Sequence, residues 1–164
     1  GSQKYTGLLA VRIKISVAFV DGDPTEPDEQ WTDAWKGQWL RAFNQRCRAM
    51  TDQKFRVACG DSTNDFANTY VFVLPHFEVR DDATDAAGAG THYELEVTLD
   101  YSNSYSRTGG KIEVGSSVDN RRIVRGLFGL DAGLGDLTTD NLADLVKWMK
   151  HNTVANGTFA AQSL

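Results

Sequence analysis

Histidines and carboxylates are the side chains of this chain that could hold a catalytic metal. A zinc site needs three or four His, Cys, Asp or Glu side chains that converge on one tetrahedral point. His76 and His92 lie on either side of a small, polar segment, and Glu94 falls on the same face of an alternating strand as His92. If the two histidine segments pair as a hairpin, His76, His92 and Glu94 can form a surface zinc site. The spacing does not require this, and scattered surface histidines are the ordinary alternative.

Oxygen ligands gather in a second segment, Asp21-Gly22-Asp23-Pro24-Thr25, with Asp28 close behind it. Hard oxygens are the ligand type that calcium prefers, so Asp21, Asp23 and Asp28 are candidate calcium ligands. The segment lacks the central glycine and the terminal glutamate spacing of the twelve-residue calcium loop. A solvated acidic turn ahead of a helix explains the same residues. We therefore expect no cofactor, and zinc and calcium are the alternatives.

Catalysis without a metal has few candidate groups. The chain has no Gly-x-Ser-x-Gly elbow and no phosphate loop. Glu94, Glu96 and Asp100 line one face of a strand, where a pair could hydrolyse a glycan only if a cleft raised one pKa. We assign no catalytic residue. A hydrolase whose site assembles from distant residues, such as His76, His92, Glu94 and Glu96 around a metal, is the alternative.

Arg121, Arg122 and Arg125 form the one basic cluster of the sequence and are candidate contacts for an acidic partner. The net charge of −5 over 164 residues argues against a general binder of nucleic-acid backbones. The sequence has no apolar run of about 18 residues, so we expect no membrane span. We expect a protein partner and no nucleic acid.

The clearest element is an amphipathic helix over about residues 28–50. Trp31, Trp35, Trp39, Phe43 and Cys47 recur at every fourth position, which places them along one face of a helix. A stripe of this kind is ordinarily core. If Trp31 and Trp35 were exposed, they could instead stack on sugar rings, and the chain would be a carbohydrate-binding module.

Alternating apolar and polar residues predict strands around that helix. These strands cover residues 11–19, 55–59, 70–79, 92–101 and 111–114, and we expect 70–79 and 92–101 to form an antiparallel hairpin. A short helix ends near Phe128, and a last helix follows Thr139. The order predicts one α+β domain with a mixed or antiparallel sheet, in which the C-terminal helices pack on the long helix.

The domain occupies residues 3–152. Gly1-Ser2 is typical of a cloning scar, and residues 153–164 are weakly patterned, as in a flexible tail. A disulfide between Cys47 and Cys59 would join the long helix to the next strand and contribute about 2–3 kcal/mol. Two buried thiols in a reducing compartment are the alternative, so the cysteines leave the compartment open.

The segment that ends in Gly129-Leu130-Asp131, taken with the long aromatic helix, resembles a bacterial zincin-like metallopeptidase domain, as found near extracellular contractile injection systems. The likeness covers residues 31–131 in layout. Zincins carry His-Glu-x-x-His on a helix before a Gly-Leu-Asp turn. Alignment on that turn puts Arg122 and Gly126 at the two metal-binding histidines and Ile123 at the general-base glutamate, so the chain lacks the motif.

The resemblance therefore implies a pseudoenzyme that keeps the fold without the hydrolysis. Without the histidines there is no zinc-bound water of lowered pKa, and without the glutamate no base takes its proton. We predict a non-catalytic binding or structural module of a larger or particle-associated bacterial or phage system. A secreted, extracellular or particle-associated location is expected rather than a cytoplasmic one. The hydrolase and the carbohydrate-binding module are the alternatives.

Overall fold

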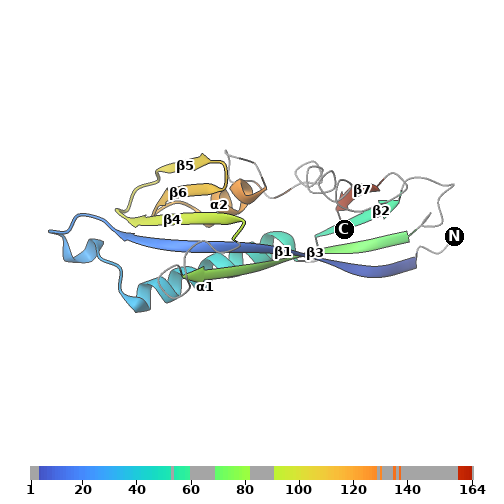
Figure 1. Cartoon of the computed structure of the whole chain (residues 1–164), viewed down its shortest axis with the longest axis horizontal. Coiled ribbons are helices and arrows are strands. Elements are labelled where there is room, and N and C mark those ends of the chain that lie inside the picture. The colour runs from blue at the N-terminus through green and yellow to red at the C-terminus, as the bar shows by residue number, and fades with distance from the viewer. Residues whose placement is uncertain are drawn as a thin grey trace. The chain divides into compact units, whose positions relative to one another are not determined.

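A computed structural model describes the backbone of residues 4–52, 54–59, 69–81, 91–128, 130, 135, 137 and 159–163. It describes the side chains of residues 10, 12–52, 54, 75–81, 91–128, 130, 135 and 137. Helices and strands follow one another as β1 (Lys4–Asp21), the 3-10 helix η1 (Pro27–Glu29), α1 (Asp33–Thr51), β2 (Phe55–Cys59), β3 (Thr69–Asp81), β4 (Tyr93–Leu99), β5 (Tyr105–Thr108), β6 (Lys111–Gly115), α2 (Asn120–Leu127) and β7 (Phe159–Ser163) (Figure 1). None of the described helices is both long enough and apolar enough to cross a membrane.

The strands form one mixed sheet in the order β5-β6-β4-β1-β3-β2-β7. β4 runs parallel to β1 and to β6, and β5 is antiparallel to β6. β2 is antiparallel to β3 and to β7. With one early and one late helix, the chain has the α+β class that the sequence predicted.

The chain divides into two compact units. The larger comprises residues 12–49 and 77–135, and the smaller comprises residues 1–11, 50–76 and 136–164. β1 and β3 each contribute residues to both units. The side chains described below as candidate site residues belong to the larger unit, except His76, which belongs to the smaller one.

The register of the parallel strands places the core of the larger unit on one face of its sheet. Val17 of β1 pairs with Leu95 of β4, which pairs in turn with Ile112 of β6. Because paired residues of neighbouring strands point to the same face, these three side chains share that face, and all three are buried. The polar residues between them point to the opposite face. The alternation that the sequence predicts over residues 92–101 is confirmed for β4, Tyr93–Leu99.

Both helices of the larger unit cover this apolar face. The ring of Trp39 on α1 meets the ring of Phe19 on β1 edge-on, with centroids 5.8 Å apart. The carbonyl of Leu127 on α2 accepts a hydrogen bond from the hydroxyl of Tyr93 on β4 at 2.6 Å. Phe19 and Tyr93 lie on the same face of the sheet because Phe19 pairs with Val97, four residues after Tyr93.

The long helix begins later than the sequence predicted. η1 takes up Pro27–Glu29, and α1 begins at Asp33 rather than at about residue 28. Thr32 sets this start, because its hydroxyl oxygen accepts a hydrogen bond from the N–H of Trp35 at 3.2 Å. Trp31 therefore precedes the helix and is not part of its periodic face.

The predicted hairpin of residues 70–79 and 92–101 is wrong. β1 lies between β3 and β4 in the sheet, and β4 pairs with β1 and β6. Alternation along a strand shows which residues share a face, but the neighbouring strand is chosen by contacts distant in sequence. The chain also forms β5, a strand that the sequence did not predict.

Two predictions concern the C-terminal part of the chain. The helix expected after Thr139 lies outside the described residues. Within the expected tail, residues 159–163 form β7, which pairs with β2. β2 lies between β3 and β7 in the sheet, so β7 supplies the backbone partners for the side of β2 that β3 leaves unpaired.

Candidate functional site

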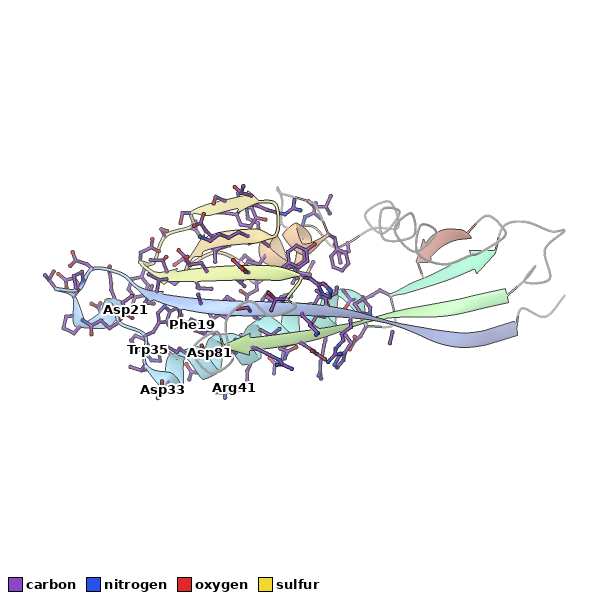
Figure 2. The ribbon with its side chains drawn as sticks, viewed as in Figure 1. Phe19, Asp21, Asp33, Trp35, Arg41 and Asp81 are labelled. Carbon is purple, nitrogen blue, oxygen red and sulfur yellow. The ribbon has the colours of Figure 1, made fainter. Side chains whose placement is uncertain are left out.

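An aromatic hollow of about 450 Å³ lies where the parallel strands β1, β4 and β6 end. Its walls are the rings of Trp31, Trp35, Trp39 and Tyr101. Gln38, Ala42, Leu99 and Ser116 complete the lining. We call this hollow the aromatic groove. Figure 2 shows Trp35 near the start of α1, at the same end of the unit as Phe19 and Asp21 of β1.

The position of the groove follows from the strand directions. Leu99 is the last residue of β4, and Ser116 directly follows β6. In sheets with parallel strands, ligands bind outside the carboxyl ends of the strands, at the place where the chain connections diverge. β1 and β4 are neighbouring parallel strands that meet this description. After β1 the chain continues to β2 and β3 on one side of the pair, and after β4 it continues to β5 and β6 on the other.

Trp31 is held in one orientation by hydrogen bonds. Its backbone N–H donates to Oδ1 of Asp21 at 2.7 Å. Its indole Nε1–H points to the carbonyls of Val20 and Val97, at 3.1 and 3.3 Å. The ring packs edge-on against Phe19, with centroids 4.8 Å apart. Trp31 is therefore a fixed wall of the groove with its polar atom already bonded.

Trp39 and Trp35 lie one helical turn apart on α1 but differ in burial. Trp39 is half-buried and stacks on Phe43, with centroids 5.1 Å apart and ring planes 22° apart. Trp35 is 39% exposed. Among the described residues, the indole N–H of Trp35 has no hydrogen-bond partner. Trp35 thus offers both an apolar ring and a donor to a ligand.

Tyr101 contributes a ring in a strained backbone conformation. Its φ is 53°, in the left-handed region that costs an ordinary residue about 1–2 kcal/mol. The backbone N–H donates to Oγ of Ser116 at 2.9 Å, and the hydroxyl donates to the carbonyl of Asp28 at 2.7 Å. The ring itself is 52% exposed. Strain of this kind gathers at ligand sites, where the surrounding structure holds a side chain in place.

The residues that line the groove are all uncharged at neutral pH. They are four aromatic rings, two aliphatic side chains, an amide and a hydroxyl. The groove therefore suits stacking and hydrogen bonding. Its lining offers no carboxylate, histidine or cysteine that could act as acid, base or nucleophile.

Two of the three candidate calcium ligands, Asp21 and Asp28, form hydrogen bonds with residues of the groove. Asp21 bonds to the N–H of Trp31, and the backbone carbonyl of Asp28 accepts from the hydroxyl of Tyr101. Asp23 accepts from the hydroxyl and the N–H of Thr25 at 2.6 and 2.8 Å, and these bonds lower the pKa of Asp23. The described residues include no group of three or more His, Cys, Asp or Glu side chains placed to hold a metal ion.

The candidate zinc ligands belong to different units. His76 is an exposed residue of the smaller unit, whereas His92 and Glu94 belong to the larger one. His92 and Glu94 border a polar hollow of about 340 Å³ with Lys111. Nδ1 of His92 accepts a hydrogen bond from the N–H of Lys14 at 3.0 Å. The hairpin on which their pairing with His76 depended is absent.

Two carboxylates of the polar face, Glu96 and Glu113, form ion pairs with Lys111. Its Nζ lies 2.7 Å from Oε1 of Glu113 and 3.4 Å from Oε2 of Glu96. The hydrogen bond from Lys111 lowers the pKa of Glu113. A general acid at neutral pH needs the opposite shift, so this pair suits a solvated, charge-balanced surface.

The three arginines of the basic cluster each have a contact within the chain. Arg121 pairs with Asp119 at 2.6 Å, and its hydrogen bond lowers the pKa of Asp119 to about 2. Arg122 lies over the ring of Tyr105, with its guanidinium carbon 4.4 Å from the centroid. Arg125 donates to the carbonyl of Gly135 at 3.1 Å. These contacts hold α2 and the segments beside it.

Cys47 lies in the core of the larger unit. Its side chain has no exposed surface, and burial raises the pKa of its thiol far above the ordinary value. A buried thiol of raised pKa is a poor nucleophile. The side chain of its predicted disulfide partner, Cys59, lies outside the described residues.

The aromatic groove was only partly foreseen from the sequence. The sequence indicates Trp31 and Trp35 as candidate sugar platforms, but it places Tyr101 at the end of the predicted strand 92–101 and not in a site. The available signal was the Ser- and Asn-rich segment that starts directly after Tyr101, which marks a strand end. Comparison of the chain with protein-family models, with curated proteins and with solved structures finds no match.

Proposed function

We propose that this protein is a non-catalytic binding module and that the aromatic groove is its binding site. The observation that carries the proposal is the exposure of Trp35 and Tyr101, 39% and 52%, in one hollow. Val20 is the one other large hydrophobic residue exposed in the described part of the chain. Clustered exposed aromatics mark interaction sites, whereas single exposed apolar residues are ordinary.

The size and lining of the groove support a ligand site. Its volume of about 450 Å³ falls in the usual range for ligand pockets, about 300–1,000 Å³. Such pockets are lined by apolar and aromatic groups with a few polar ones, as Gln38 and Ser116 are here. The one titratable side chain of the lining is Tyr101, whose hydroxyl already donates to Asp28. Binding without catalysis is the activity that this lining supports.

The proposal includes that this chain is a pseudoenzyme on a zincin-like scaffold, as the resemblance implies. Gly126 stands where the resemblance puts a metal-binding histidine, and a Cβ added there would collide with the hydroxyl of Tyr105. Arg122 stands at the other histidine position and is held over the same ring. Both positions thus serve the packing of α2 on β5, which supports a scaffold used for binding. The same proposal makes the chain a module of a larger or particle-associated bacterial or phage system.

Titration followed by tryptophan fluorescence tests the binding proposal. The probes are three neutral hexasaccharides (cellohexaose, maltohexaose and the hexamer of N-acetylglucosamine) and a polyproline peptide. We expect saturable binding of at least one probe, weakened at least about tenfold in Trp35→Ala, a loss of about 1.4 kcal/mol. Val20→Ala is the matched control, because Val20 is equally exposed and lies outside the groove lining.

Mass spectrometry of the probes after incubation tests the absence of catalysis. We expect every probe to be recovered unchanged. Turnover of any probe contradicts a non-catalytic module and directs attention to the polar hollow beside His92 and Glu94. Binding that Trp35→Ala leaves unaltered, or no binding of any probe, contradicts the groove as the site.

A further inference from the structure

We infer that the ligand of the aromatic groove is a neutral oligosaccharide that stacks on Trp35 and Tyr101. This inference rests on the proposed function and adds the chemical class of the ligand. A sugar ring presents an apolar face of C–H groups and a rim of hydroxyls. Such a ligand needs flat aromatic surfaces with nearby groups that both donate and accept hydrogen bonds.

Two of the aromatic surfaces, Tyr101 and Trp31, are fixed before a ligand arrives. The hydroxyl and the backbone N–H of Tyr101 are both bonded, to Asp28 and Ser116. Trp31 is bonded through its backbone and indole N–H groups. Rigid rings lose little conformational entropy on binding, so a weak stacking contact contributes most of its free energy to affinity.

The charge of the groove separates sugars from other flat ligands. No charged residue lines it, and the protein as a whole carries a net charge of −5. A nucleotide or an anionic glycan would bring negative charge to this surface without a basic partner. An uncharged ligand meets no such penalty.

The polar groups of the groove favour hydroxyls over peptide carbonyls. Gln38 has an amide and Ser116 a hydroxyl, and each can both donate and accept. Oγ of Ser116 accepts from the N–H of Tyr101, so its own proton can be donated to a ligand. Extended proline-rich peptides bind aromatic-lined grooves that also donate to peptide carbonyls. Here the hydroxyl of Tyr101 and the indole N–H of Trp31 already donate within the protein, which leaves the indole N–H of Trp35 as the aromatic donor for a ligand.

Isothermal titration with the same three hexasaccharides, a polyproline peptide and heparin tests the ligand class. We expect at least one hexasaccharide to bind, and Trp35→Ala and Tyr101→Ala each to weaken it at least about tenfold. Val20→Ala should leave the affinity within about twofold of the parent. The affinity should also change less than about twofold between roughly 50 and 200 mM salt, because no charge is neutralised.

Two variants keep the result interpretable. Trp35→Phe retains a smaller ring, so its affinity should fall between those of the parent and Trp35→Ala. Tyr101→Phe retains the ring without the hydroxyl, which faces Asp28 rather than the ligand, so binding should persist. The near-ultraviolet circular dichroism of each variant shows whether the fold is intact.

The outcomes separate the two proposals. Binding of polyproline in the groove, without binding of any hexasaccharide, overturns the sugar ligand and leaves the binding module standing. Salt-sensitive binding of heparin alone also overturns the sugar ligand. If no probe binds, both proposals fail. Equal binding by the parent and both alanine variants overturns the site itself.

Discussion

One aromatic stripe has two different environments in this molecule. At the C-terminal end of α1, which we call the far end, Phe43 and Cys47 have no exposed surface, and Met50 is almost fully buried. At the N-terminal end, which we call the near end, Trp35 is 39% exposed and Trp39 is half-buried. Trp31 lies just ahead of the helix. The spacing along the sequence is four residues throughout from Trp31 to Cys47. Periodicity therefore predicts which residues share a helix face, but the depth of their burial depends on what that face meets.

The sheet explains the difference. The near end of α1 lies where β1 and β4 finish, since Trp31 bonds to Val20 and Trp39 meets Phe19. Beyond those strand ends none of the described residues covers the indole of Trp35, which is 39% exposed, and the groove opens. The far half of the stripe is buried, since Phe43 and Cys47 have no exposed surface. Core and candidate site are thus two parts of one amphipathic pattern.

Phe43→Ala should have the largest effect on stability. Phe43 is completely buried, and removal of a buried aromatic side chain costs about 3–5 kcal/mol in the free energy of unfolding. Chemical denaturation measures this loss. If the substitution cost less than about 1 kcal/mol, the far end of the stripe would not be core, and the comparison would fail there.

Trp39→Ala should cost less free energy of unfolding than Phe43→Ala and more than Trp35→Ala. Trp39 is half-buried and contacts both Phe43 and Phe19, and each aromatic pair contributes about 0.5–1.5 kcal/mol beyond its buried area. We expect a loss of about 2 kcal/mol together with weaker ligand binding. A loss of stability as large as that of Phe43→Ala, without weaker ligand binding, would mean that Trp39 is a core residue and not part of the site.

Asp119→Ala should act on the buried end and leave the groove unchanged. Asp119 accepts from the N–H of Arg121 as the N-cap of α2 and has a favourable charge interaction with Arg46 of α1. At neutral pH we expect a loss of about 1 kcal/mol. The folded pKa of about 2 is below the ordinary 3.8, so the part of this contribution that depends on the charge is present above pH 4 and is lost as the pH falls towards 2.

Denaturation of the parent and Asp119→Ala across this pH range measures the effect. The difference between the two proteins should shrink with acidification. A difference that is constant from neutral pH to pH 2 would show that the charge of Asp119 does not contribute. Asp119→Asn is the matched control, because asparagine keeps the N-cap and removes the charge.

Tyr101 allows a test of strain at the open end. Glycine adopts a positive φ without steric cost, whereas alanine keeps the Cβ. Tyr101→Gly should therefore be more stable than Tyr101→Ala by about 1 kcal/mol, although both remove the ring. Thermal unfolding of the two variants gives the difference. Equal stabilities would mean that the backbone at residue 101 relaxes and that no strain is held there.

The sequence predicted local features better than pairings. The alternation of β4 and the periodicity of α1 are properties of a few consecutive residues, so the α+β class followed from them. The placement of β1 between β3 and β4 depends on contacts far apart in the chain, and the predicted hairpin was wrong. The predicted start of α1 was too early because the acidic Pro27–Glu29 segment resembles a helix N-terminus. The residue that caps the helix is Thr32.

The candidate site was harder to predict, because it has no motif. Trp31 and Trp35 were identified as residues that would bind sugars if exposed, and exposure is a tertiary property. Tyr101 and Ser116 join them from two separate strand ends, which only the parallel pairing of β4 and β6 brings together. Histidine and carboxylate counts directed attention to metals, while the groove uses aromatic rings and neutral polar groups.

The stability of Trp35→Ala tests most directly whether the near end of the stripe is a surface site. We predict that chemical denaturation shows a loss below about 1 kcal/mol, because Trp35 is 39% exposed, while hexasaccharide binding falls at least about tenfold. A loss of about 3–5 kcal/mol would mark Trp35 as core and contradict the groove.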